Sequence, residues 1–163
     1  MIAREASSGY DLAYRLKIMQ NTHHSQIYPM LAKLEENGYL LSTTQFQERK
    51  PNKKVYAITL NGLELLREWS KTPVKVPVSR DEFIIKLQLD WLNPSRTSEL
   101  LEERIRYLEE QLRETEKTLV TIQETLGLTS TNEKKSNMPY QIYQRKYQLT
   151  LTEKNWCLNL LGK

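Results

Sequence analysis

The chain has 163 residues, 39% hydrophobic and 27% charged, a composition typical of a globular protein with one ordinary domain or two small ones. It has no membrane-spanning apolar run, no signal pattern and one cysteine, which excludes an internal disulfide, so we expect a cytoplasmic protein without a membrane partner. The net charge of +4 arises from residues 1–78, which contain eleven Lys and Arg and seven Asp and Glu. Residues 79–163 contain thirteen of each kind and are neutral. This asymmetry favours a nucleic-acid-binding half followed by an assembly half, although a solvated basic surface would give the same count.

The first predicted elements are two helices. Ser8 followed by Asp11 resembles a capping box and predicts a helix that ends near Gln20. Thr22 can cap a second helix, because apolar residues then recur at spacings of four and three. Asn37-Gly38 should end that helix, since glycine accepts the left-handed conformation.

Two short strands and a third helix are predicted next. Residues 40–47 and 55–58 are β-type runs, and residues 48–54 between them form a turn with four positive charges. Thr59 can cap a helix with leucines and a tryptophan on one face. Residues 71–78 contain two prolines, neither compatible with a helix interior, so we place the domain boundary there.

The second half predicts almost continuous helix. Ser79 with Glu82 should open a helix that continues to Trp91, and a long helix should run from Asn93 to Gly127. The apolar positions of the long helix follow a four-and-three series broken at Thr115, the spacing of a coiled-coil seam: Leu101, Ile105, Leu108, Leu112, Leu119, Ile122 and Leu126.

A polar loop and a last helix complete the prediction. Residues 129–137 are polar and predict a loop, and residues 139–161 predict a helix that is apolar on more than one face. Such a helix needs more than one covering neighbour, and a second subunit can supply that cover. A homodimer is therefore expected.

The order helix, helix, strand, basic turn, strand is typical of a winged helix-turn-helix, in which the second helix enters the major groove of double-stranded DNA and the wing contacts phosphates. The residues predicted to bind DNA lie at the start of the second helix and on the wing: His23, His24, Ser25, Gln26, Tyr28, Arg49, Lys50, Lys53 and Lys54. Tyr28 has a packing role in the core as its alternative, and the wing cations have a merely solvated turn as theirs.

Several motifs in this order resemble the PadR family of transcriptional regulators. They are Gly9-Tyr10-Asp11-Leu12, Ser25-Gln26-Ile27-Tyr28-Pro29 with Leu31 and Leu34, Gly38, Val55-Tyr56-Ala57-Ile58-Thr59 with Gly62, and Asp81-Glu82-Phe83 with Lys86. The resemblance implies an N-terminal winged helix and C-terminal helices that build a two-fold dimer. The long second half is similar to the subgroup of phenolic-acid-responsive repressors and virulence-type activators. Family members have a full helix before the Gly-Tyr pair, so the resemblance leads us to expect that this first helix is missing or truncated here.

The resemblance also implies a small aromatic effector. The residues expected to bind an aromatic carboxylate are Phe83, Lys86, Trp91, Tyr143 and Trp156. Lys86 would supply the cation, with an ion pair to an acidic side chain of the dimer as the alternative.

Nothing in the sequence predicts catalysis. It contains no phosphate loop or nucleophile elbow, and the only histidines, His23 and His24, have no other metal ligand at suitable spacing, so we expect no enzyme, metal or cofactor.

The expected fold is mainly α with a small β-wing: a winged helix-turn-helix DNA-binding domain at 1–72 and a helical, coiled-coil-like dimerisation domain at 79–163. The expected function is a sequence-specific DNA-binding transcriptional repressor, dimeric and controlled by an aromatic effector. The alternative is a coiled-coil interaction module whose winged helix binds protein rather than DNA.

Overall fold

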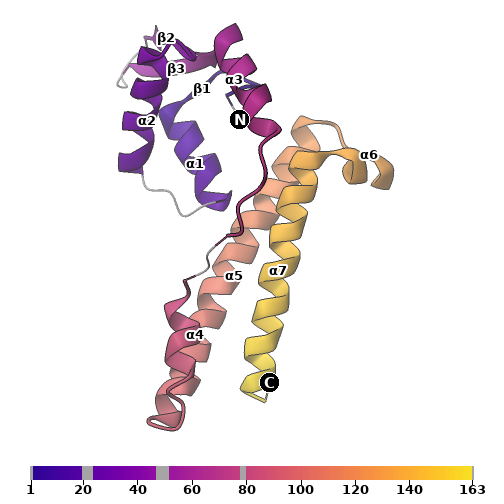
Figure 1. Cartoon of the computed structure of the whole chain (residues 1–163). Coiled ribbons are helices and arrows are strands. Elements are labelled where there is room, and N and C mark those ends of the chain that lie inside the picture. The colour runs from indigo at the N-terminus through magenta and orange to yellow at the C-terminus, as the bar shows by residue number, and fades with distance from the viewer. Residues whose placement is uncertain (1, 20–23, 47–51, 78–79, 163) are drawn as a thin grey trace. The chain divides into compact units, whose positions relative to one another are not determined.

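The computed structural model describes residues 2–19, 24–46, 52–77 and 80–162, which divide into two compact units, Met1–Val76 and Pro77–Lys163 (Figure 1). The first unit contains β1 (Ser7–Ser8), α1 (Gly9–Met19), α2 (His24–Glu36), β2 (Leu40–Gln45), β3 (Lys53–Ile58) and α3 (Leu60–Ser70). The second contains α4 (Glu82–Leu87), α5 (Pro94–Thr125), α6 (Thr131–Ser136) and α7 (Met138–Leu160). The prediction of a mainly helical protein with a small β-sheet is confirmed.

The boundaries of the first two helices follow from local capping. The Asp11 amide donates to Ser8 Oγ at 3.2 Å, and the Ser8 hydroxyl donates to the Asp11 carboxylate at 2.8 Å, which confirms the predicted start of α1. Gly38, the second residue after α2, has a φ of 74°, so the predicted end of that helix is also confirmed. Thr22, the expected cap of α2, lies outside the described residues.

The sheet has three antiparallel strands in the order β1-β3-β2. β2 pairs with β3 from Leu40 opposite Ile58 to Gln45 opposite Lys53. The predicted hairpin is confirmed, but β3 begins two residues earlier than expected and β2 is described to Gln45. The sequence did not predict β1, whose two serines pair with Tyr56 and Val55.

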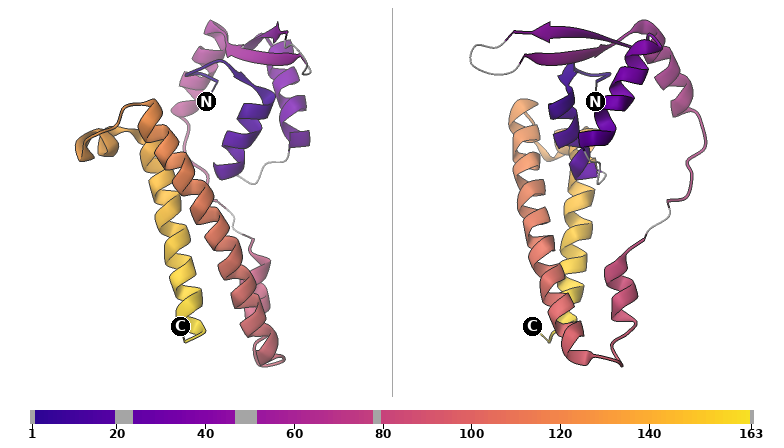
Figure 2. Two further views of the ribbon diagram at one scale, coloured as in Figure 1. Left: turned by 180° about the vertical axis from the view of Figure 1, so that it is seen from behind. Right: turned by 90° about the vertical axis from the view of Figure 1, so that its left-hand side faces the viewer.

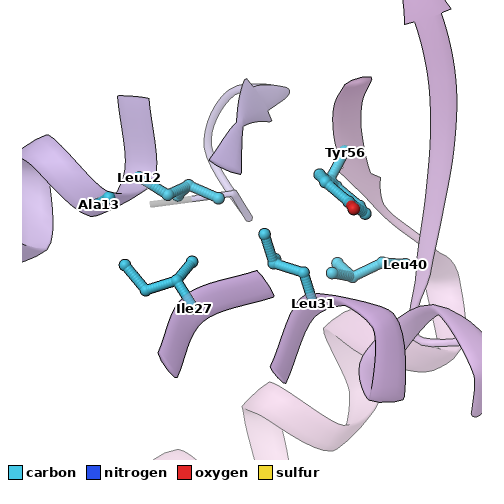
Figure 3. Close-up of a cluster of buried hydrophobic side chains, with 6 residues drawn as sticks. All are labelled: Leu12, Ala13, Ile27, Leu31, Leu40 and Tyr56. Atoms are coloured by element: carbon cyan, nitrogen blue, oxygen red, sulfur yellow. The ribbon is translucent and has the colours of Figure 1, made fainter. Parts of the chain in front are cut away.

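A small hydrophobic core holds the first unit together. Its buried side chains come from both helices and from the hairpin: Leu12, Ala13, Ile27, Leu31, Leu40 and Tyr56 (Figure 3). The apolar spacing that predicted the helices therefore supplies the face that packs against the sheet. This packing fixes the start of α2 relative to the wing.

In the second unit, α5 and α7 lie side by side and run in opposite directions (Figure 2). Asn93 caps α5, its side chain accepting from the Arg96 amide at 3.3 Å, and Pro94 occupies the first turn, where its missing N–H costs nothing. α5 buries Leu101, Leu108 and Leu119 of the predicted seam. Thr115, which interrupts the apolar series, is fully buried because its hydroxyl donates to the Gln111 carbonyl at 2.7 Å.

Two predictions for this unit are wrong in part. The helix expected to reach Trp91 ends at Leu87, because tighter i to i−3 hydrogen bonds, such as Leu89 to Lys86 at 3.0 Å, replace the α-helical pattern. Its cap is Asp81, which accepts from the Phe83 amide at 3.1 Å, whereas Ser79 lies outside the described residues.

The second correction concerns residues 129–137, which were predicted to form a loop. They contain α6, opened by a capping box in which Ser130 accepts from the Glu133 amide at 3.2 Å and the Glu133 carboxylate accepts from the Ser130 amide at 2.8 Å. The Ser-x-x-Glu spacing that signals this helix is present in the sequence.

No helix among the described residues is long and apolar enough to cross a bilayer.

Gly62 produces the tightest approach in the first unit. A Cβ atom there would lie 2.2 Å from the Tyr39 carbonyl oxygen, which accepts a hydrogen bond from the Thr59 amide at 3.1 Å. We therefore expect Gly62→Ala to lower the free energy of unfolding by about 1–3 kcal/mol, because the backbone must move to relieve the overlap. Urea denaturation measures this, with the exposed neighbour Asn61→Ala as control. Equal stability of the two variants would contradict the packing described.

Candidate nucleic-acid interface

The first turns of α2 present polar side chains to solvent. Ser25 and Gln26 are exposed, while Ile27, the next residue, is 4% exposed and packs into the core. The first turn of α2 contains no acidic residue, so the partial positive charge of the helix N-terminus is not offset locally. This end of α2 can therefore approach a polyanion and hydrogen-bond to it. His24 belongs to α2, and His23 lies outside the described residues.

Tyr28 packs against a neighbouring helix with one part of its ring and is exposed with the rest. Its ring lies against the start of α1, where a Cβ on Gly9 would come within 2.6 Å of Tyr28 Cε1. The side chain is nevertheless 48% exposed. The side chain is therefore not part of the buried core, and its contact with DNA stays a prediction.

The wing is the hairpin formed by β2 and β3. Both of its described lysines, Lys53 and Lys54, form ion pairs. Lys53 Nζ lies 2.9 Å from Asp11 Oδ2 at the start of α1, and Lys54 Nζ lies 2.7 Å from Glu35 Oε2 near the end of α2. Lys54 also lies over the Tyr56 ring, 5.2 Å from its centroid. Arg49 and Lys50, the other predicted wing cations, lie outside the described residues.

The carboxylates of these pairs are also bound by serines. The Ser8 hydroxyl donates to Asp11, and the Ser42 hydroxyl of β2 donates to Glu35. The ammonium of Lys53, followed by the Ser8 hydroxyl, holds the pKa of Asp11 below its ordinary value. Lys54 and then Ser42 lower the pKa of Glu35 in the same way. Both carboxylates are therefore ionised at neutral pH.

The residues predicted to bind an effector do not all come together. Phe83 meets Trp156 edge to face, with ring centroids 6.5 Å apart. Tyr143 is buried on α7, thirteen residues before Trp156 and thus about 20 Å away along the helix. Trp91 lies beyond the end of α4 and is 76% exposed.

Lys86 pairs with an acidic side chain of its own helix. Its Nζ lies 2.7 Å from Glu82 Oε1, one turn earlier in α4. The cation that contacts Phe83 is Arg104, whose Cζ lies 4.9 Å from the ring centroid. Arg104 also donates to Asp81 at 2.8 Å and to Glu153 at 2.7 Å. These contacts join α4, α5 and α7.

The sequence analysis did not predict that Asp11 and Glu35 pair with the wing lysines. It also did not predict that Arg104 connects α4, α5 and α7. No local signal could have found Glu35, because its partner lies nineteen residues away and the contact depends on tertiary packing. Arg104 is one of many charged residues on a long helix, and nothing in its spacing distinguishes it. In the described ranges, no group of three or more His, Cys, Asp or Glu could hold a metal ion.

The family model for the "Transcriptional regulator PadR-like family" matches residues 1–68, which include α1, α2, the wing and most of α3. The N-terminal unit of the chain is therefore similar to the PadR-like family, over a match that spans less than half of the sequence. The predicted resemblance is thereby confirmed, and the matching proteins are transcriptional regulators rather than enzymes.

Two curated relatives support this PadR-like assignment. A probable transcriptional regulator of Mycobacterium tuberculosis is 38% identical over 77 residues, which cover 45% of this chain and 41% of that protein. The negative transcriptional regulator PadR of Bacillus subtilis is 32% identical over 104 residues, which cover 60% of this chain and 57% of that protein. The matched segments thus span between two fifths and just under three fifths of these relatives.

Solved structures agree with the PadR-like fold. Bacillus subtilis PadR in complex with operator DNA has a TM-score of 0.76 at 22% identity, covering 99% of this chain and 92% of that one. The same protein in complex with p-coumaric acid has a TM-score of 0.66 at 22% identity, with the same coverage. A Streptococcus mutans protein has a TM-score of 0.77 at 23% identity, covering 97% and 92%. At these identities, the likeness establishes the fold.

Proposed function

We propose that this PadR-like chain is a sequence-specific DNA-binding transcriptional repressor that acts in the cytoplasm as a homodimer. The observation that carries the proposal is the exposed start of α2, which offers Ser25 and Gln26 without a nearby acidic residue and lies on a family-matched winged unit. A helix presented in this way fits the major groove of DNA, and an amide such as that of Gln26 can pair with adenine through two hydrogen bonds. The negative regulation named for the Bacillus subtilis relative supports the repressor role.

Phosphate contacts are proposed on either side of this helix. In the sequence, His23, His24 and Tyr28 come at or near the first residues of this helix, and Arg49 and Lys50 carry the remaining positive charge between the two wing strands. Cations beside the duplex gain affinity by releasing its bound counterions.

The homodimer proposal rests on two parallel rows of side chains along α7. Tyr143, Thr150 and Cys157, seven residues apart, are buried. Ile142, Leu149 and Trp156, each one residue earlier, are 43%, 53% and 42% exposed. One row is therefore covered within the chain, and the other leaves apolar surface in water, which is unfavourable in proportion to its area.

A second copy would cover this row by repeating it across a two-fold axis, the commonest symmetry of soluble homo-oligomers. The helix α4 also exposes apolar surface that a second copy could cover. None of its residues is buried, and Ile84 and Ile85 are 43% and 65% exposed.

An effector is the third part of the proposal. A PadR relative has been crystallised with p-coumaric acid, and in this chain Phe83 and Trp156 form an aromatic pair that could stack on such a ring. Lys86 could bind the carboxylate, because its pair with Glu82 is exposed to solvent, contributes little to stability and can be exchanged for a ligand. An effector of this kind acts by binding the DNA-competent and incompetent dimers unequally.

Gln26→Ala tests the recognition helix. The wild-type chain should select, from a pool of random duplexes, two half-sites about one DNA turn apart. The variant should lose preference at one position of each half-site, equivalent to about 1–3 kcal/mol of discrimination. The exposed Gln148→Ala on α7 serves as control and should select the wild-type sequence. If the wild type selects no duplex, the proposal fails and the protein-binding alternative is favoured.

Leu149→Glu tests the homodimer. Placing a charge in the exposed apolar row should convert a dimer into a monomer of 19.3 kDa in sedimentation equilibrium at micromolar concentration. Gln148→Glu, one residue away, should remain dimeric. A wild-type chain that sediments as a monomer would contradict the proposal.

Titration with p-coumaric acid tests the effector. The acid should quench tryptophan fluorescence and weaken binding to the selected duplex, and Trp156→Phe should lose most of the quenching because its indole lies beside Phe83. Lys86→Met should lower the affinity for the acid about tenfold, the loss expected for one charge-assisted contact. Lys117→Met, an exposed control on α5, should behave as the wild type. No quenching at millimolar acid, or an unaltered Lys86→Met, would exclude this site.

A further inference from the structure

Two ion pairs of the wing lie where the sheet narrows from three strands to two. β1 pairs only with Val55 and Tyr56, so the sheet has three strands at these residues and two at Lys53 and Lys54. A two-stranded hairpin is marginally stable in water unless further contacts support it. The ion pairs of Lys53 and Lys54 lie at this transition from three strands to two.

Each pair joins the hairpin to a different helix. Side chains of consecutive strand residues point to opposite faces of the sheet. Lys53 therefore reaches Asp11 of α1, while Lys54 reaches Glu35 of α2. Glu35 binds both strands of the wing, since its Oε1 accepts from Ser42 of β2 and its Oε2 from Lys54 of β3. Asp11 likewise connects Ser8 of β1 with Lys53 of β3.

We infer that Asp11 and Glu35 are positioning residues for DNA binding, and that Lys53 and Lys54 anchor the wing to the helices instead of contacting phosphate. This inference rests on the proposed function and differs from the sequence-based assignment of both lysines to the phosphate contacts. Glu35 is the stronger case, because one carboxylate of the recognition helix fixes both wing strands. The described strands of the wing, β2 and β3, are thereby held at a set position relative to α2.

The two roles of a lysine predict opposite effects when its carboxylate partner is removed. If Lys54 contacted phosphate, Glu35 would compete with DNA, and Glu35→Gln would tighten binding. If Lys54 is an anchor, Glu35→Gln releases the wing and weakens binding. Loss of a phosphate contact also reduces the slope of log K against log salt by about 0.9, whereas loss of an anchor leaves that slope unchanged.

The test measures dissociation constants by fluorescence anisotropy at several salt concentrations, with the duplex selected by the wild-type chain and a scrambled duplex of equal length. We expect Glu35→Gln and Lys54→Gln each to weaken binding to the selected duplex about three- to tenfold with an unchanged salt slope. Asp11→Asn and Lys53→Gln should act in the same direction. Lys50→Gln, the matched control, should reduce the slope by about 0.9.

The charge exchange Glu35→Lys with Lys54→Glu decides between the roles. The double variant restores an ion pair of opposite polarity, so binding should recover to within about twofold of the wild type if Lys54 only anchors the wing. A phosphate-binding position would instead present a carboxylate to DNA and lose further affinity. Failure to recover, tighter binding by Glu35→Gln, or a reduced slope in Lys54→Gln would each overturn the inference.

A measurement without DNA separates this inference from the proposed function. In a carboxyl NMR titration, Lys54→Gln should raise the pKa of Glu35 and leave that of Asp11 unchanged, and Lys53→Gln should do the reverse. Unchanged pKa values would show that the pairs do not form in solution, which overturns the positioning role. If the pKa values respond but the wild type binds no duplex, the proposed function has failed and the positioning role falls with it.

Discussion

The geometry of the winged unit depends on one small hydrophobic core. Six buried side chains from α1, α2, β2 and β3 hold the helices against the sheet. A core of this size stabilises the elements that contribute to it, but the hairpin extends beyond the last core residue, Tyr56. The outer part of the wing therefore depends on polar contacts, and the structure supplies them through two helix carboxylates. Hydrophobic packing thus fixes the position of α2, and ion pairs fix the outer described part of the hairpin.

Local signals predicted most of the elements. Capping at Ser8, Thr59 and Asn93, together with the glycine after α2, depends on neighbours within four residues, so the sequence contains all the information needed. The same holds for the exposed start of α2, because the spacing of Ile27 and Leu31 already assigns the opposite face to the core. The missed helix α6 had its signal in Ser130 and Glu133, which was overlooked because its composition is polar.

What could not be predicted depends on contacts between distant segments. The pairing of Ser7 and Ser8 with β3 joins residues almost fifty positions apart, and no β-type composition marks the two serines. The pair of Glu35 with Lys54 likewise follows from the hairpin register and the packing of α2, neither of which a charge pattern reveals. The expected effector residues were grouped by chemistry, whereas the helical rise separates Tyr143 from Trp156.

The thiol of Cys157 can be used to measure local opening of the second unit. It is the only cysteine of the sequence, it is fully buried beside Leu101 and Leu108, and burial raises the pKa of its thiol. A thiol in this state reacts slowly with alkylating reagents, both because the reagent cannot reach it and because little thiolate is present. Its modification therefore requires α5 and α7 to separate locally, and the rate of labelling reports the free energy of that opening without any engineered probe.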